Sequence, residues 1–361
     1  MTPAVGALNR CWAGAGTVHG ELPTVRRSAI CVFLLALLLG VVVPSKATTP
    51  QPPSMRFGVY PGNTFTFGKY AGITGTNSRP FDDELALQRM VELANGRPFD
   101  VHLYAQWDRD NLAELDPFLA RISEAGLQAN VALKYVPPAG HDGDIAGFAA
   151  WVATSVQSHP NVAVWQITNE ANVGVSPDSD GSAKDPLGAL IEGVIAAAGV
   201  KTPEQEVGFN WFYHLDPVSD RAFWSTLATR GGEAFHNAVD YAGVDIYSGT
   251  YVNPLYSVDD EGDFRAALDY VRNQMMPLAN LGAEVPIYIQ ETGYPTLGPL
   301  RTQERQADAL RGYIRAAQGF NVELLQWFQL ADADSTLGDG WGLLDSNYSP
   351  KPAFDVMRNG G

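Results

Sequence analysis

Cysteine is almost absent from this chain of 361 residues. Both cysteines, Cys11 and Cys31, lie among the first 47 residues, so a product without that segment has no thiol, no disulfide and no cysteine-bound metal. Its stability must then come from a large core. A hydrophobic content of 45% and an aromatic content of 11% are sufficient for such a core and exclude a chain that is disordered throughout.

Basic residues are also scarce, with 24 Lys and Arg against 40 Asp and Glu and a formal net charge of −16 at pH 7. A surface this acidic repels the phosphates of nucleic acid and of anionic lipid, so neither is expected as a partner, whereas neutral sugar polymers are compatible with it. The sequence holds no Gly-x-Gly-x-x-Gly fingerprint, no phosphate-binding loop and no Ser–His–Asp pattern. We expect no cofactor and no metal.

The apolar stretch Ser28–Val43 has sixteen residues, fewer than the roughly 20 that cross a membrane. It follows Arg26 and Arg27 and precedes the small-x-small site Ser45-Lys46-Ala47, which is the pattern of a signal peptide. We therefore predict a signal peptide at 1–47, secretion, and no membrane contact after cleavage. An uncleaved N-terminal anchor is the alternative, and the long basic region leaves open a translation start near Val25.

A Pro-rich linker is predicted at 48–54, followed by one catalytic domain at 55–361. In that domain, strand-like apolar runs alternate with amphipathic helical stretches, as in parallel α/β proteins. The candidate strands are Arg56–Tyr60, Asp100–Tyr104, Gln128–Tyr135, Val162–Thr168, Glu206–Phe212, Tyr241–Tyr247, Pro286–Gln290 and Leu324–Leu330. The candidate helices are Asp82–Asn95, Arg109–Ala125, Asp144–Ser158, Pro186–Ala198, Pro217–Thr229, Glu261–Asn280, Thr302–Gln318 and Pro352–Arg358.

Eight such units in about 300 residues predict a single (β/α)8 TIM barrel, with a doubly wound open sheet as the rival. Local signals support the helices. Asp82 and Thr302 stand where N-caps are needed, and Gly126 and Gly199 stand at helix ends, where a left-handed residue is common.

Two of the predicted strands end in glutamate. Glu170 follows Val162–Thr168 and Glu291 follows Pro286–Gln290, 121 positions later, which is about three units of 40 residues. Chemistry in such barrels lies at the carboxyl ends of the strands, and strands four and seven face each other there. Two carboxyl groups that flank one sugar are what glycoside cleavage requires. The alternative for either residue is a structural ion pair.

The segments Trp165–Glu170 (WQITNE) and Ile289–Pro295 (IQETGYP) resemble the signature strands of glycoside hydrolase clan A, the retaining barrel β-glycosidases that include cellulase-, mannanase- and galactanase-like enzymes. The ending from Trp341 to Phe354 is similar to the last barrel unit of several of its families, and no single family is assigned. The resemblance implies Glu170 as general acid/base, Glu291 as nucleophile and Asn169 as a partner of the sugar 2-hydroxyl.

The resemblance also implies that Tyr247 contacts the nucleophile and that Trp327 forms the floor of a sugar subsite. Trp107 and Trp211, near other strand ends, are further candidates for substrate binding. Each of these aromatics could instead simply line the barrel. The sequence also places the following residues near strand ends, as weaker candidates: Tyr104, Gln106, Lys134, Asn210 and His214.

The expected function is retaining hydrolysis of a β-O-glycosidic bond in an extracellular glycan by a monomeric enzyme. A transglycosylase on the same site and a catalytically silent glycan-binding barrel are the alternatives. The turn Asp178–Gly181 resembles a calcium loop only weakly and is interpreted as a plain turn. Asp332–Gly340 is expected to form an active-site loop after the eighth strand.

Overall fold

The computed structural model describes residues 55–62, 82–109, 112–176, 178–251, 259–296, 298–332 and 340–361. The predicted signal peptide and linker lie outside these residues, as does 333–339 of the predicted loop after the eighth strand. Within the described part, no helix combines the length and the apolar character that a membrane crossing requires.

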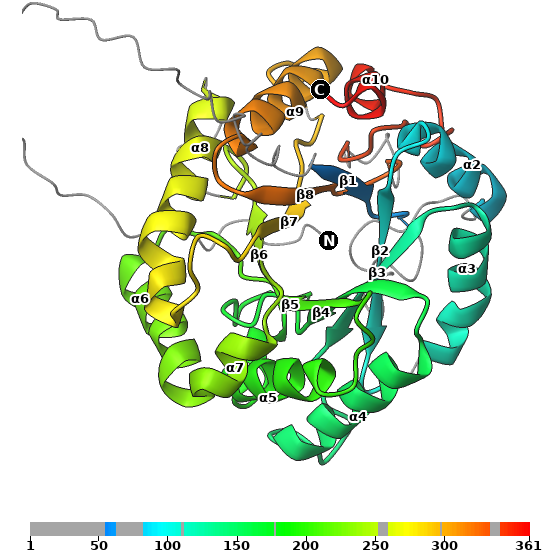
Figure 1. Ribbon diagram of the computed structural model, residues 1–361. Coiled ribbons are helices and arrows are strands. Elements are labelled where there is room, and N and C mark those ends of the chain that lie inside the picture. Colours follow the sequence, from blue (N-terminus) through cyan, green and yellow to red (C-terminus); the bar gives the residue numbers. More distant parts are fainter. Residues whose placement is uncertain are drawn as a thin grey trace, which may run out of the picture. The chain divides into compact units, whose positions relative to one another are not determined.

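Eight parallel strands close into a barrel, in which each strand pairs with the next and β1 pairs with β8 (Figure 1). The β1–β8 pairing excludes the open sheet and confirms the single (β/α)8 barrel. The strands are β1 (Arg56–Val59), β2 (Phe99–Gln106), β3 (Gln128–Lys134), β4 (Val162–Ile167), β5 (Glu206–Phe209), β6 (Tyr241–Ile246), β7 (Ile287–Thr292) and β8 (Val322–Trp327).

The helices form an outer ring around these strands (Figure 1). They are α2 (Asp83–Ala94), α3 (Leu112–Glu124), α4 (Ile145–Ser158), α5 (Pro186–Ala198), α6 (Pro217–Thr226), α7 (Gly232–Ala238), α8 (Asp260–Tyr270), α9 (Gln303–Ala317) and α10 (Pro352–Asn359). Short 3-10 or π turns at Asp180–Ser182, Leu227–Gly231, Val271–Met275 and Met276–Ala279 complete the helical segments.

The helix ends follow the predicted local signals, with one exception. Asp82 accepts a hydrogen bond from the Leu85 amide at 3.0 Å, and Thr302 accepts one from the Arg305 amide at 3.3 Å. Gly126 adopts the predicted left-handed conformation, with φ at 73°. The same prediction is wrong for Gly199, whose φ is −68°, because its amide bonds back to Ile195 within the right-handed turn.

The helical path after β5 is longer than the predicted Pro217–Thr229. Gly231 and Gly232 interrupt it, yet the chain resumes as α7. The fully buried Phe235 of α7 packs at 5.9 Å from Phe209 of β5. This packing on the barrel outweighs the low helix propensity of the two glycines.

Alternation along the strands separates two packing layers. One set of strand residues, such as Val101 and Leu103, packs outward in the main apolar core with the helices. The inward set begins with a small apolar cluster at the amino end and continues with buried polar side chains, including His102 and Gln326. Inward side chains at the carboxyl ends therefore converge at the mouth of the barrel, where the predicted glutamates lie.

Candidate active site

Glu170 and Glu291 lie together at the carboxyl end of the barrel. Glu170 is three residues beyond β4 and Glu291 lies in β7, and their side chains are 8% and 7% exposed. One carboxyl oxygen of Glu170 lies within 4.8 Å of one carboxyl oxygen of Glu291. This short distance fits retaining glycosidases, with about 5 Å between the carboxyl groups, rather than inverting ones, with roughly 6.5–9.5 Å.

A bulge in β7 directs Glu291 into the mouth. The β6–β7 register shifts between Val244 and Asp245, so that Val244 pairs with Ile289 but Asp245 with Glu291. Gln290 therefore points inward as well, and donates to the Tyr241 hydroxyl at 2.9 Å. In a regular strand two successive residues would lie on opposite faces, and a bulge re-aims one of them.

Three tyrosine hydroxyls donate hydrogen bonds to Glu291. Tyr60 donates to Oε1 at 3.1 Å, Tyr104 also donates to Oε1, and Tyr247 donates to Oε2 at 2.8 Å. Burial raises the pKa of Glu291 above its ordinary value, and the hydrogen bonds from these three hydroxyls offset part of that rise. The donors favour the ionised carboxylate, which is the form that a nucleophile needs.

Glu170 lies in a different environment. Burial and then the negative charge of Glu291 raise the pKa of Glu170 to about 8, while a hydrogen bond from Ser179 and the charge of Lys134 act in the opposite direction. Ser179 donates to Oε2 of Glu170. Burial and the neighbouring charge thus favour the protonated form of Glu170, which is the form that a general acid needs.

The backbone after β4 is held in an uncommon conformation. Thr168 and Glu170 have φ values of 64° and 47°, in the left-handed region that non-glycine residues seldom occupy. The Asp180 carboxylate accepts a hydrogen bond from the Asn169 amide at 2.7 Å. The Asn210 side chain accepts one from the Glu170 amide at 2.8 Å. These bonds from the β4 and β5 loops compensate the strain and fix the direction of the Glu170 side chain.

Asn169 is part of the same network. Its side-chain oxygen accepts from Asn210 Nδ2 at 2.9 Å, and its Nδ2 donates to the Asp178 carbonyl at 2.9 Å. The turn Asp178–Gly181 thus does more than reverse the chain, because its residues hold both Asn169 and Glu170. The interpretation as a plain turn was incomplete.

Asp245 of β6 is a third buried carboxyl group below the pair. It accepts a hydrogen bond from Asn210 Nδ2, and burial, followed by the charges of Glu291 and Glu170, raises its pKa well above the ordinary value. One oxygen from each of the three carboxyl groups lies within 4.8 Å of the others, close enough for a shared cation. The hydroxyl and amide donors around them fit protonated and hydrogen-bonded carboxyl groups better than a cation site.

Two of the predicted aromatic residues are fully buried away from the two glutamates. Trp327 is fully buried and points outward to α9, 6.4 Å from Tyr313, with its indole N–H donating to the Trp341 carbonyl at 3.0 Å. Trp211 is also fully buried, packed edge-on at 5.7 Å against Trp224 of α6. Neither ring has a face that a sugar could reach, which corrects both predictions.

Trp107 is half-buried beside α4. Its ring stacks on Tyr135 at 5.9 Å and meets Phe148 edge-on at 5.7 Å. These contacts place it in the strand–helix layer rather than against the two glutamates. Tyr247 is the predicted aromatic that the structure does bring to Glu291.

Among the weaker candidates, Tyr104, Lys134 and Asn210 belong to the site. His214 instead lies 3.5 Å from Asp220 of α6. The candidates that sequence reasoning missed are Tyr60, Ser179, Asp245, Phe328 and Trp341. Tyr60 and Phe328 directly follow β1 and β8, so the strand-end rule could have found them. Nothing local in the sequence identified the other three.

The comparisons with known proteins give a likeness of fold. No protein-family model matches the chain, and no curated protein matches its sequence. Solved structures do match, and they include a family 39 glycoside hydrolase, a β-glucosidase and a β-glucuronidase. The fold is therefore one that glycoside hydrolases of the (β/α)8 type share.

One such structure is a family 39 glycoside hydrolase from the gut symbiont Bacteroides cellulosilyticus, with a TM-score of 0.60, 14% identity, and alignment over 86% of this chain and 63% of that one. A β-glucosidase from Thermotoga maritima gives a TM-score of 0.56 and 13% identity, over 86% of this chain and 99% of that one. A β-glucuronidase from Ruminococcus gnavus gives a TM-score of 0.54 and 16% identity, over 86% of this chain and 49% of that one.

Proposed function

We propose that this protein is a retaining β-glycosidase, with Glu291 as nucleophile and Glu170 as general acid/base. The observation that carries the proposal is the asymmetry of the close pair. Glu291 accepts hydrogen bonds from three tyrosine hydroxyls, which favour its ionised form. The pKa of Glu170, raised to about 8, favours its protonated form. The different environments of the two carboxyl groups favour Glu291 as the ionised nucleophile and Glu170 as the protonated acid.

In the first step, a carboxylate oxygen of Glu291 attacks the anomeric carbon and the bond from that carbon to the leaving oxygen breaks. Glu170 gives its proton to the leaving oxygen. Ser179 already donates to Oε2 of Glu170, so the proton to be transferred belongs on Oε1. The product of this step is a glycosyl ester on Glu291.

In the second step, the ionised Glu170 takes a proton from water, whose oxygen attacks the anomeric carbon. The ester bond breaks and Glu291 leaves as a carboxylate. Tyr60, Tyr104 and Tyr247 stabilise the charge that returns to it. Because both attacks invert the carbon, the sugar leaves with its β configuration retained.

The test uses 2,4-dinitrophenyl β-glycosides of glucose, galactose, mannose and xylose, together with the two single variants. Glu291→Gly removes the attacking oxygen, so turnover falls by several orders of magnitude, and added azide fills the hole to give an α-glycosyl azide. Glu170→Ala still forms the ester, since this leaving group needs no proton, and azide then yields the β-azide.

Glu204→Ala, which removes an exposed carboxylate in the loop before β5, is the matched control and keeps full turnover. Opposite anomers from the two variants, identified by NMR, support both roles. The reverse pattern would exchange the two roles, and unchanged activity in both variants would refute the site. If the wild-type protein binds glycans without turnover, it is a catalytically silent barrel. If a sugar rather than water accepts the glycosyl group, it is a transglycosylase.

We also propose that the enzyme is secreted and acts on a β-linked extracellular glycan. The support for secretion is the signal-peptide pattern at 1–47. The support for β-linked sugars is the β-glucosidase and the β-glucuronidase that share the fold. A screen of glycan libraries with mass analysis of the products identifies the linkage and the mode of cutting.

A further inference from the structure

A cluster of aromatic rings extends from the nucleophile to the rim of the barrel mouth. The ring of Tyr247, whose hydroxyl donates to Glu291, meets Tyr251 edge-on at 5.4 Å and Trp341 edge-on at 5.5 Å. Tyr251 and Trp341 stack on each other at 5.9 Å with 29° between their planes. We call Tyr251, in the loop after β6, and Trp341, in the segment after β8, the aromatic platform.

The outer part of this platform is open to solvent. Tyr251 is 61% exposed, and Trp341 is half-buried. A large aromatic ring that is exposed beside a site for sugars is suited to the C–H face of a pyranose, because stacking removes apolar area from water while the sugar hydroxyls stay hydrated.

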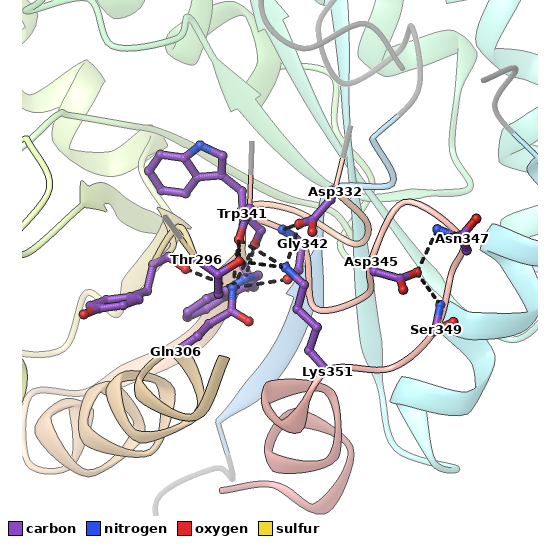
Figure 2. Close-up of polar contacts among 12 residues, drawn as sticks. Thr296, Gln306, Asp332, Trp341, Gly342, Asp345, Asn347, Ser349 and Lys351 are labelled. Atoms are coloured by element: carbon purple, nitrogen blue, oxygen red, sulfur yellow. Dashed lines mark hydrogen bonds and ion pairs between the residues drawn. The ribbon is translucent and has the colours of Figure 1, made fainter. Parts of the chain in front are cut away.

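A buried polar network fixes the position of Trp341 (Figure 2). Lys351, just before α10, donates to Asp332 Oδ1 at 2.7 Å and to the Gly340 carbonyl at 3.2 Å. Asp332 accepts the Gly342 amide at 2.7 Å, and Gln306 of α9 donates to the carbonyls of Gly340 and Gly342. Both neighbours of Trp341 in the chain are thereby held, so its ring is presented in a fixed orientation, as a preorganised binding surface requires.

We propose that the aromatic platform binds a second sugar unit of the substrate, on the side of the scissile bond away from the leaving group. The proposal rests on the proposed function. The leaving group must lie beside Glu170, which protonates it, whereas both platform rings contact Tyr247, whose hydroxyl donates to Glu291. The substrate class is thus a β-linked chain with at least two sugars on the non-leaving side, rather than a simple aryl or alkyl monosaccharide.

The test compares 2,4-dinitrophenyl β-monosaccharides with the corresponding β-disaccharides of the gluco, manno, galacto and xylo series. The leaving group stays constant, and only the second sugar differs. In the wild-type protein the added sugar raises kcat/KM. In Tyr251→Ala that gain falls by roughly tenfold, mainly through KM. Tyr251→Phe keeps the ring and retains the gain, which separates stacking from the hydroxyl.

Trp341→Ala shows a still larger fall in the gain, because the indole ring is removed and Tyr251 loses the ring on which it stacks. An equal loss for monosaccharide and disaccharide would mean general damage to the site and would overturn the proposal, as would an unchanged ratio in Tyr251→Ala. If the wild-type protein hydrolyses none of the aryl glycosides, the proposed function fails separately. Binding of cellotriose, mannotriose, galactotriose and xylotriose, measured by calorimetry, then tests the platform as a sugar site. Weaker binding in Tyr251→Ala supports the platform, and absence of binding to the wild-type protein refutes it.

Discussion

Ser179 shows how one side chain can set the behaviour of Glu170, the proposed acid/base. Its hydroxyl donates to Oε2 of Glu170, and this bond lowers the pKa of Glu170 against the opposing effects of burial and of Glu291. The position of Ser179 depends on Asp180, which accepts the amides of Tyr135 and Asn169, both at 2.7 Å. The serine is a positioning residue, since it acts on substrate only through Glu170.

Removing that hydroxyl should shift the pH dependence of turnover. In Ser179→Ala the ionised form of Glu170 loses a donor, so its pKa rises and the basic limb of kcat/KM moves up by roughly one pH unit. Deglycosylation, which needs ionised Glu170, slows at acid pH. Ser179→Thr keeps a hydroxyl and leaves the profile close to that of the wild type. A basic limb that stays in place or moves down in Ser179→Ala would contradict this role.

The same carboxyl group should affect stability. The pKa of Glu170 is raised from 4.5 to about 8, so the folded protein binds this proton more tightly than the unfolded chain does. That stabilisation is complete below about pH 4.5 and is lost as the pH rises through 8. Glu170→Gln cannot ionise, so its Tm relative to the wild type should rise by a few degrees between pH 5 and pH 9. Differential scanning calorimetry at both pH values measures the effect, and a difference in Tm that does not change with pH would contradict it.

At the scale of elements, the segment after β8 depends on the buried pair of Lys351 and Asp332, whose side chains are 2% and 3% exposed. Lys351→Met leaves the Asp332 carboxylate buried without its cation, at a cost of about 3–5 kcal/mol. Arg311→Ala breaks the exposed pair with Asp308 and should cost less than about 1 kcal/mol.

Denaturant unfolding of the two variants measures both values. Disaccharide binding is a second readout, because a displaced Trp341 weakens it in Lys351→Met. Similar losses of stability in the two variants would show that the buried pair does not organise this segment.

At the scale of the whole molecule, the barrel closes through β1–β8 pairing and has a continuous apolar layer between strands and helices. We expect this domain to fold without residues 1–47. A protein that begins at Thr48 should keep its Tm, its turnover and a monomeric state, as measured by calorimetry, kinetics and light scattering. Loss of solubility on this deletion would show that the segment has a structural role.

The sequence by itself determined the eight-unit order, most element boundaries to within a few residues, and the two glutamates. These features depend on local periodicity, caps and the position of charged residues at the ends of apolar runs, all of which can be read along the chain. The resemblance to clan A pointed in addition to Tyr247, whose hydroxyl donates to Glu291, and to Asn169, which accepts a hydrogen bond from Asn210 beside Glu170.

The direction of side chains was decided only by the tertiary structure. A bulge in β7 brings both Gln290 and Glu291 inward, against simple alternation. In β8, Trp327 points outward to α9, while the next residue, Phe328, reaches the mouth. The hydrogen bond from Asn210 to Asp245 also joins the segments after β5 and in β6, which are 35 positions apart in the chain. Strand phase and long-range hydrogen bonds depend on how the barrel closes, which no local pattern encodes.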